Sequence, residues 1–192
     1  MTHSVTLTGE FVNLRPLTVA DAALTFSWRH GKRAKLLHEG PGSVEQQEAW
    51  IGARPASEYN FIIELKNGRA VGMLSVVGID RLNRHAEPAR FLIGEADAVK
   101  GMPAAVEAMK LLYEFIFDRL DVVRVWGTIA AENIQMITWQ KYLGMKEEGR
   151  LRRHCFINGH FQDNILLGLL VEEYREVTLP RMNALMAAST LR

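Results

Sequence analysis

The sequence contains only one cysteine, Cys155, among its 192 residues. A single cysteine permits neither an internal disulfide nor a cysteine metal cluster, which fits a reducing compartment. A lone cysteine beside an aromatic residue on a strand is more often inert than an acyl-carrying nucleophile, so we assign it no chemistry. No pair of histidines has the spacing of a helical metal site, and we expect no metal.

Long apolar runs are missing as well. No stretch of the sequence is long enough and apolar enough to span a bilayer. Residues 1–13 lack the basic and then apolar order of a signal peptide. We therefore expect a cytoplasmic protein that has no membrane partner.

Neither sign of charge is in excess, because 23 Lys and Arg residues against 22 Asp and Glu residues give a formal net charge of +1. Nonspecific binding to nucleic acid needs a basic face, so we expect no nucleic-acid partner. The one dense basic run, residues 150–154, is typical of a solvated strand edge, and an anion site is the alternative.

The length and the apolar content indicate one compact domain, because 192 residues with 48% hydrophobic side chains can bury a sizeable core. We assign residues 1–171 to this domain. Residues 172–192 are predicted to form a C-terminal helical tail, interrupted at Pro180, that packs on the same domain or on a partner. Both a monomer and a homodimer agree with this organisation.

Strand signals occur along most of the chain. Residues 5–15 alternate apolar and polar side chains and are expected to form a first strand. Residues 61–65 and 70–77 flank Asn67–Gly68, which predicts a type I′ hairpin, and Asn158–Gly159 indicates a second hairpin.

Helix signals lie between these strands. Thr18 with Asp21, and Ser43 with Gln46, have the spacing of capping boxes that open two helices in the first third of the chain. Together with the strands, they predict a mixed α/β domain.

The most informative segment begins at a short loop that leads directly into an amphipathic helix, whose apolar residues run from Met109 to Leu120. The loop consists of Lys100, Gly101, Met102, Pro103, Ala104 and Ala105. A helix entered through small residues offers its unpaired first-turn amides to an anion, and Lys100 adds a positive charge. Pro103 fits the first helical turn. The loop therefore predicts a phosphate site, with an ordinary helix start as the alternative.

A β-branched strand over residues 122–129 and a second helix over residues 134–143 follow this helix. Asn133 is suited to cap the second helix, and Gly144 to end it in a left-handed conformation. Because Asn133 lies directly after the strand, its amide is also a candidate for contact with a ligand.

Taken in order, these pieces resemble the GNAT superfamily of acyl-CoA-dependent N-acyltransferases, in particular the branch of ribosomal-protein N-terminal and amino-sugar N-acetyltransferases. The matching pieces cover nearly the whole chain: Val12–Leu17 with Asp21, Val71–Gly72, Ile79–Asp80, Ala86–Glu87, Lys100–Ala105, Asn133, Leu143–Met145, Glu148–Gly149, Leu151–Arg152 and Asp163.

The resemblance implies an α/β (α+β) fold with a mixed, mostly antiparallel central sheet of about seven strands, flanked by helices and followed by a C-terminal helical extension. It implies direct transfer of an acetyl group from acetyl-CoA to a primary amine. Glu87, placed before a strand at the coenzyme cleft, is then the candidate catalytic base. Leu92 and Ile93 would pair through their backbone with the pantetheine arm, and the loop and Asn133 would complete the coenzyme site.

Two positions depart from the family pattern. Pro103 stands where the loop usually has Gly and removes one backbone donor, which leaves the strength of coenzyme binding open. Gln140 stands where many members have a Tyr that protonates the departing thiolate, and an amide has no useful acidity. Tyr142 falls on nearly the opposite side of the helix.

On the acceptor side, Trp28, Arg29 and Trp50 resemble positions in enzymes that acetylate amino sugars on nucleotide carriers. The two tryptophans are candidates to stack on a base or sugar, or alternatively close the core. The acceptor is thus expected to be a small-molecule amine or a protein N-terminus. A coenzyme-binding regulatory module without turnover is the alternative from another class.

Overall fold

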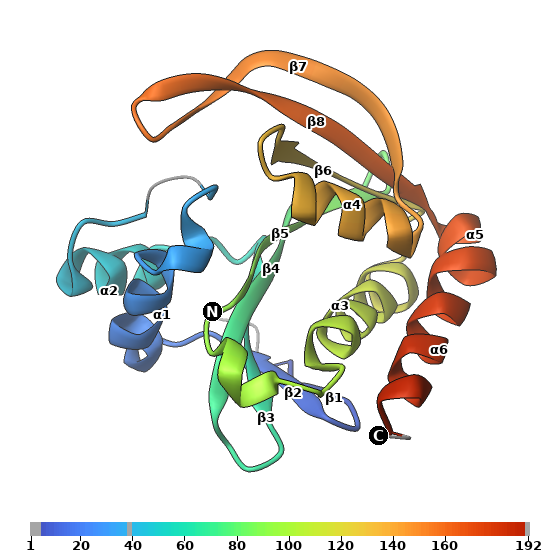
Figure 1. The fold of residues 1–192 in the computed structure, drawn as a ribbon. Helices are drawn as coiled ribbons and strands as arrows, with labels where there is room; N and C mark the ends of the chain where they lie inside the picture. Colours follow the sequence, from blue (N-terminus) through green and yellow to red (C-terminus); the bar gives the residue numbers. More distant parts are fainter. Residues whose placement is uncertain (1–4, 38–39, 191–192) are drawn as a thin grey trace.

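The computed structural model describes residues 5–37 and 40–190 of the chain. Within these residues, eight strands form a single sheet in the order β1-β2-β3-β4-β5-β6-β8-β7 (Figure 1). The strands are β1 (Leu7–Thr8), β2 (Val12–Pro16), β3 (Tyr59–Leu65), β4 (Ala70–Asp80), β5 (His85–Ile93), β6 (Arg124–Ala130), β7 (Lys146–Ile157) and β8 (His160–Leu170). Each neighbouring pair is antiparallel except β5 and β6, which run parallel. The predicted mixed, mostly antiparallel sheet is confirmed.

Helices cover both faces of this sheet (Figure 1). The α-helices are α1 (Ala22–Arg29), α2 (Val44–Gly52), α3 (Ala104–Glu114), α4 (Ile134–Leu143), α5 (Val171–Glu173) and α6 (Leu179–Thr190). Short 3-10 turns occupy Val19–Asp21, Lys32–Ala34 and Ala96–Val99, and π-helical turns occupy Phe115–Arg119 and Tyr174–Thr178.

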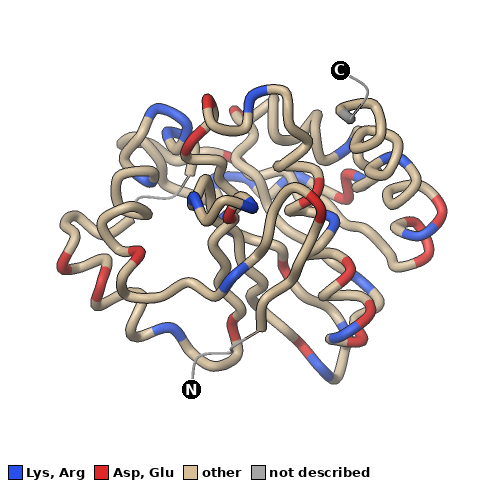
Figure 2. Tube along the Cα trace, turned by 90° about the horizontal axis from the view of Figure 1, so that it is seen from below, with Lys and Arg blue, Asp and Glu red and all other residues tan. Residues whose placement is uncertain are grey.

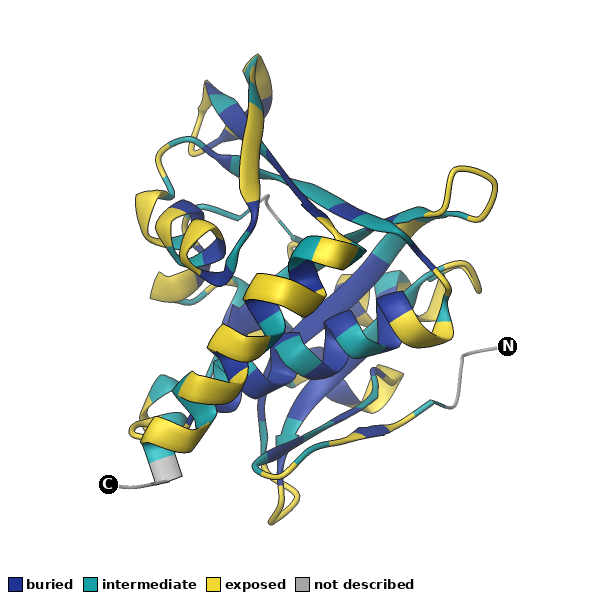
Figure 3. Cartoon of the chain, turned by 90° about the vertical axis from the view of Figure 1, so that its right-hand side faces the viewer, coloured by how far each residue is buried: buried dark blue, intermediate teal, exposed yellow. Residues whose placement is uncertain are grey.

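Two apolar cores result from the two-residue period of the strands. Phe61 and Ile63 of β3 belong to the core beneath α3, whereas Ile62 between them belongs to the core beneath α1 and α2. The central strands are dark blue behind α3 in Figure 3, which shows how completely this helix covers them. The sheet is therefore the middle layer of three.

The N-terminal strand differs from the prediction. Residues 5–15 do not form one strand; β1 and β2 form a tight hairpin, in which the Gly9 amide donates to the Val12 carbonyl over 2.9 Å. The Glu107 carboxylate accepts the amides of Glu10, Phe11 and Val12 over 2.5, 2.7 and 2.7 Å, so a distant helix supplies the partners for this turn. Residue alternation could not indicate that contact.

The two Asn–Gly turns, both in hairpins, have different backbone conformations. Asn158 and Gly159 both have positive φ, 53° and 80°, as a type I′ turn requires. At the first hairpin Gly68 has φ 83° while Asn67 does not have a positive φ, and the Leu65 amide bonds to the Arg69 carbonyl over 2.8 Å. This is a three-residue loop that ends in a left-handed glycine, so the hairpin was predicted correctly and its turn type wrongly.

The C-terminal segment folds back on α3. Tyr174 and Met182 are buried, and the Tyr174 ring packs against Tyr113 and Phe117 with centroid distances of 5.7 and 4.9 Å. Pro180 does not interrupt the helix, because a π-helical turn precedes it and changes the hydrogen-bond register where proline lacks a donor.

Basic and acidic residues are interspersed over the trace, and neither sign gathers on one face in the view of Figure 2. Among the described residues, no helix is both long and apolar enough to cross a membrane.

Candidate active site

The sheet opens where its parallel pair ends. β5 and β6 are paired only at His85 with Arg124 and at Ala86 with Val125. Beyond these residues β5 stays with β4 and β6 stays with β8, so the two strands separate toward their carboxyl ends. A crevice at the carboxyl ends of parallel strands is a favoured place for ligands in α/β sheets.

A β-bulge deforms β5 at this opening. The register with β4 shifts between Met73 and Ser75, so that Arg90 and Phe91 together face Leu74. Arg90 adopts a positive φ of 57°, which is unusual for a residue with a side chain. Phe91 stacks on Trp139 of α4, with ring centroids 5.3 Å apart and planes inclined by 11°.

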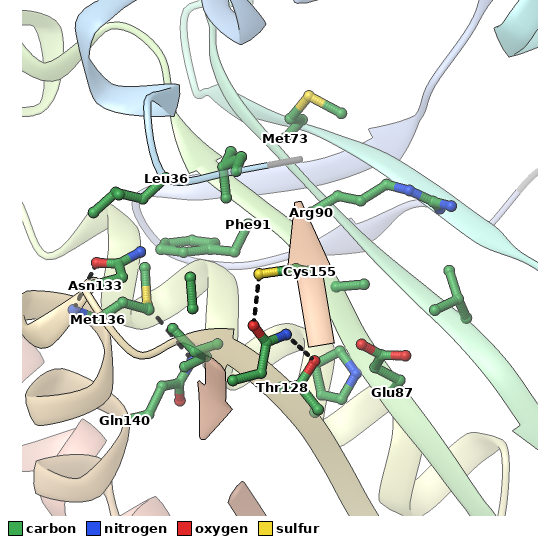
Figure 4. Close-up of a pocket in the computed structure, with 18 of the residues that line it drawn as sticks. Leu36, Met73, Glu87, Arg90, Phe91, Thr128, Asn133, Met136, Gln140 and Cys155 are labelled. Carbon is green, nitrogen blue, oxygen red and sulfur yellow. Dashed lines mark hydrogen bonds between the residues drawn. The ribbon is translucent and has the colours of Figure 1, made fainter. Parts of the chain in front are cut away.

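A cavity of about 630 Å³ fills the opening. β5 lines one wall with Glu87–Phe91, and β6 lines the other with Trp126–Ala130. Cys155 and Ile157 of β7 also line it. Figure 4 shows Glu87 and Arg90 toward one end of the cavity and Asn133, Met136 and Gln140 toward the other.

The loop at the start of α3 follows the carboxyl end of β5. Lys100, Gly101 and Met102 are exposed, and Gly101 has a φ of 79°. Pro103 is the N-cap and not a first-turn residue, with Ala104 buried directly after it. Because the proline precedes the helix, the first-turn amides of residues 104–106 are all retained and have no partner within the helix. Pro103 itself still has no N–H to donate, so a weakening of coenzyme binding by this proline stays a prediction.

The other predicted coenzyme contacts lie in two places. Asn133 caps α4 by accepting the Met136 amide over 3.2 Å, and it also lines the cavity. Leu92 and Ile93 lie beyond the bulge, and their side chains are buried in opposite cores and do not line the cavity. The residues of the loop at Lys100 do not line the cavity either. The predicted contacts of this loop, and of the backbone of Leu92 and Ile93, with the coenzyme stay predictions.

Glu87 lies within β5 and not before it, because the strand begins at His85. Its side chain faces Gly127 across the opening, where a Cβ at Gly127 would lie 3.8 Å from Glu87 Cγ. Burial raises the pKa of the Glu87 carboxyl, and the charge of Arg90 opposes the increase. Within the described part of the chain, no hydrogen bond or ion pair holds this carboxyl, which leaves it available to accept a proton.

The three predicted acceptor residues do not come together. Arg29 and Trp50 line the cavity, but Trp28 does not. Trp28 is 5% exposed, packs tightly over Gly94, and donates from Nε1 to Glu95 Oε1 over 2.9 Å. The structure therefore places Trp28 in the core, where its ring has no free face for a substrate.

Trp50 lies against two arginine side chains. The guanidinium carbons of Arg54 and Arg90 lie 4.2 and 5.1 Å from its ring centroid. Two cations over one indole form a cation–π arrangement that holds both guanidinium groups. Trp50 thus contacts two arginines and also packs against the core beneath α1 and α2, which agrees with the alternative that it closes the core; stacking on a substrate stays a prediction.

Sequence reasoning missed several residues of the cavity. Arg90 gave no signal, because an arginine within a strand is usually solvated. Tyr113 falls within the predicted amphipathic helix, where no role was assigned to it, yet its hydroxyl lies 3.4 Å from Gln140 Oε1 in the cavity wall. Asn164 accepts from the Cys155 thiol over 2.8 Å and donates to Thr128 Oγ1 over 3.0 Å.

Cys155 fits the interpretation as an inert thiol. Its side chain is buried, and burial raises the pKa of the Cys155 thiol. A thiol that stays protonated is a poor nucleophile, so this cysteine contributes a hydrogen bond to the cavity wall.

A mixed sheet that opens beside a helix N-terminus, with a carboxyl group in the opening, agrees with the acyl-CoA-dependent N-acyltransferase fold that the sequence resembles. The profile of the family described as acetyltransferase (GNAT) domain matches residues 12–146, and the chain belongs to this family. The predicted resemblance is confirmed.

Individual relatives of known name share less than a third of their residues with this chain over the matched segments. Spermidine N(1)-acetyltransferase of Escherichia coli (strain K12) is 29% identical over 118 residues, which cover 62% of this chain and 61% of that protein. A Bacillus subtilis (strain 168) protein with the provisional name ribosomal N-acetyltransferase YdaF is 30% identical over 110 residues, 57% of this chain and 58% of that one. These matches span about three fifths of each relative's length.

Solved structures share this fold over nearly the whole of the chain. A GCN5-related N-acetyltransferase from Brucella melitensis superposes with a TM-score of 0.80 at 22% identity, covering 95% of this chain and 85% of that one. At this identity the likeness supports the fold alone.

Proposed function

We propose that the protein transfers an acetyl group from acetyl-CoA directly to the primary amine of a small molecule. The observation that carries the proposal is the opening between β5 and β6, where the Glu87 carboxyl lies beside the cavity that begins as the two strands separate. The first-turn amides of α3 and the exposed Lys100 are suited to the coenzyme's phosphates.

Glu87 supplies the base in this proposal. The amine nitrogen forms a bond to the thioester carbonyl carbon as its proton passes to the Glu87 carboxylate, directly or through water. The carbon–sulfur bond then breaks, and the sulfur leaves as a thiolate that takes up a proton. The products are an N-acetylated amine and the free thiol of the coenzyme.

The cavity's enclosure favours a small acceptor over a protein N-terminus. β7 adds Cys155 and Ile157 to the cavity wall, and Asn158 at the tip of the β7–β8 hairpin donates to the Lys35 carbonyl over 3.1 Å. This contact joins the hairpin to the segment after α1. A protein N-terminus would have to bring the residues that follow it past this hairpin, whereas an amino sugar on a nucleotide, our first candidate, is a smaller group.

Turnover against a panel of amines, with release of free thiol as the readout, tests the proposal. Amine-dependent thiol release is expected in the wild type and is expected to fall in Glu87→Gln. The panel includes an amino sugar, a nucleotide amino sugar, spermidine and a peptide with a free N-terminus. Preference for the peptide would favour a protein N-terminal acetyltransferase, and coenzyme binding without turnover on any amine would favour a regulatory module.

A further inference from the structure

Thr128 of β6 offers a hydrogen-bond donor to the cavity. Among the cavity-lining residues of β5 and β6, the side chains that can donate are Arg90, Trp126 and Thr128. Arg90 Nη1 donates to Glu58 Oε2 over 2.9 Å. Trp126 Nε1 donates to His85 Nδ1 over 3.2 Å. The Thr128 hydroxyl donates to no acceptor within the described part of the chain, so its proton is available to a ligand in the cavity.

Asn164 of β8 fixes the position of this hydroxyl. Its side chain is buried, and both ends of its amide are hydrogen-bonded: Oδ1 accepts from Cys155 Sγ over 2.8 Å, and Nδ2 donates to Thr128 Oγ1 over 3.0 Å (Figure 4). The Cys155 thiol stays protonated and donates, because burial raises its pKa, so the amide is held in one orientation. Since Thr128 Oγ1 accepts from Asn164, its own proton is left for another partner.

Thr128 and Glu87 belong to the same face of the sheet. Ala86 and Val125 form the last pair between β5 and β6, and both lie in the core beneath α3. Side chains alternate along a strand, so Glu87, one residue after Ala86, faces the opposite side. Thr128, three residues after Val125, faces that side too. Figure 4 shows both at one end of the cavity, so the proposed base and the unused donor face the same space.

The spacing of Glu87 and Thr128 suits an amine that attacks a carbonyl group. Along the strand direction, Thr128 lies two residues beyond the level of Glu87, a rise of about 7 Å. A hydrogen bond of about 2.8 Å at each end leaves room between the two side chains for the amine nitrogen, the carbonyl carbon and the carbonyl oxygen. An amine held at Glu87 therefore brings the oxygen of the thioester toward Thr128.

We infer that the Thr128 hydroxyl donates a hydrogen bond to the thioester carbonyl oxygen, and that Asn164 positions this hydroxyl. As the amine nitrogen bonds to the carbonyl carbon, one electron pair of the carbonyl moves to the oxygen, which gains negative charge. The pair returns as the carbon–sulfur bond breaks, so Thr128 keeps its proton throughout. A donor that is already in place needs no reorganisation when the charge develops, and it lowers the barrier for that reason. The inference rests on the proposed acetyl transfer and adds a catalytic residue to it.

Three variants test the role of Thr128 in assays of thiol release. Valine has nearly the shape of threonine but no donor, so Thr128→Val is expected to lower kcat about a hundredfold, the usual effect of removing one such donor. Thr128→Ser keeps the hydroxyl and should retain kcat within about tenfold. Thr8→Val makes the same change at an exposed strand position and should match the wild type. An unchanged kcat in Thr128→Val would overturn the inference. A raised KM for the amine at wild-type kcat would also overturn it, because the hydroxyl would then contact the acceptor.

Asn164→Leu tests the positioning role. Leucine has a similar volume and cannot donate to Thr128 Oγ1, so kcat should fall, though by less than in Thr128→Val because the hydroxyl remains. A melt without ligand verifies folding, and Asn164→Asp, which keeps the acceptor for Cys155, is the second variant. In the Thr128→Val background either change should cost little further, since the two residues act as a unit. Losses that multiply in the double variant would contradict the role of Asn164.

The carbonyl stretch of bound acetyl-CoA, isotope-labelled at the carbonyl carbon, separates the inference from the proposed function. A hydrogen bond to the oxygen lowers this frequency, so the wild-type band should lie below that of Thr128→Val, with Thr128→Ser near the wild type. The measurement needs no acceptor amine. A lowered band without turnover would support the hydrogen bond although the enzymatic proposal had failed. Turnover with the same band and the same kcat in Thr128→Val would overturn the inference and leave acetyl transfer intact, and a wild type that does not bind acetyl-CoA would overturn both.

Discussion

The hydroxyl of Tyr113 lies 3.4 Å from the side-chain carbonyl oxygen of Gln140, in the buried wall of the cavity. Burial raises the pKa of Tyr113, so this hydroxyl stays protonated and donates to the amide. The Gln140 amide nitrogen is then directed away from Tyr113, with Met136 Sδ at 4.0 Å. An amide in this orientation can donate a hydrogen bond but cannot deliver a proton.

Gln140→Ala is therefore expected to keep most of the turnover, within about tenfold of the wild type under saturating substrates, because a thiolate leaves without a strong acid. Stopped assays of free thiol measure the rate. Tyr142→Phe is the matched control, since Tyr142 is 54% exposed on the outer side of the same helix. A thousandfold loss in Gln140→Ala, about 4 kcal/mol of barrier, would mean that Gln140 is essential to thiolate departure.

Glu87→Gln is expected to lower turnover by about a hundredfold and to leave acetyl-CoA binding intact, which is the usual effect of removing a positioned base. The base acts when ionised, and burial raises the pKa of Glu87, so the wild-type rate should increase with pH through a value above the ordinary one for a glutamate. The loss in the variant should become smaller at high pH, where more amine is already deprotonated. Glu172→Gln, at an exposed position, serves as the control, and equal rates in Glu87→Gln across the pH range would remove Glu87 from the mechanism.

The same raised pKa has a consequence for stability. A carboxyl whose pKa is higher in the folded state stabilises the fold below its unfolded pKa, and this contribution is lost as pH rises through the folded pKa. At neutral pH the folded protein therefore holds an unfavourable, partly buried charge that Glu87→Gln removes. We expect a higher Tm for the variant at pH 7 and a difference that shrinks toward pH 4; a lower Tm at pH 7 would contradict an unpaired, partly buried Glu87.

The parts of this site that follow local rules could be predicted from the sequence. Asn133 caps α4 and Gly144 ends it with a φ of 122°, because capping depends on neighbouring residues. For Trp28 the sequence left two positions open, stacking on a substrate or closing the core, because residue type alone does not show whether a sheet or a cavity lies opposite a tryptophan near the end of a helix; the structure places it in the core. Arg90 was missed for a related reason: its direction depends on a bulge that arises from the pairing of β5 with β4.

Lys100 tests the coenzyme end of the site. At a hundredfold excess over the dissociation constant, acetyl-CoA should stabilise the fold by roughly 2.7 kcal/mol, visible as a rise in Tm. Lys100→Glu should reduce this rise and leave the ligand-free melt nearly unchanged, because the side chain is exposed. Lys66→Glu reverses a charge at the β3–β4 hairpin and should leave the rise in place. Coincident melts of the wild type with and without millimolar acetyl-CoA would exclude the predicted site.

The clamp between Glu107 and the β1–β2 turn should determine whether α3 keeps its position beneath the sheet. The Glu107 carboxylate accepts three backbone amides, and a Cβ at Gly9 would lie 2.6 Å from the Glu107 carboxyl carbon. Glu107→Gln replaces an acceptor oxygen with a donor and is expected to cost about 3 kcal/mol of unfolding free energy, since hydrogen bonds to a charged group are lost around the buried Val12 amide. Gly9→Ala should destabilise as well, by displacing the carboxylate.

Gly52→Ala is the control for the clamp, because a Cβ there meets no atom within 4 Å and alanine favours the end of α2. Chemical denaturation monitored by tryptophan fluorescence measures all three variants. Since Glu107 belongs to the first turn of α3, both clamp variants should also weaken the stabilisation by acetyl-CoA, whereas Gly52→Ala should not. A Gly9→Ala variant as stable as Gly52→Ala would show that the turn relaxes around the added methyl group and that Glu107 does not fix the helix.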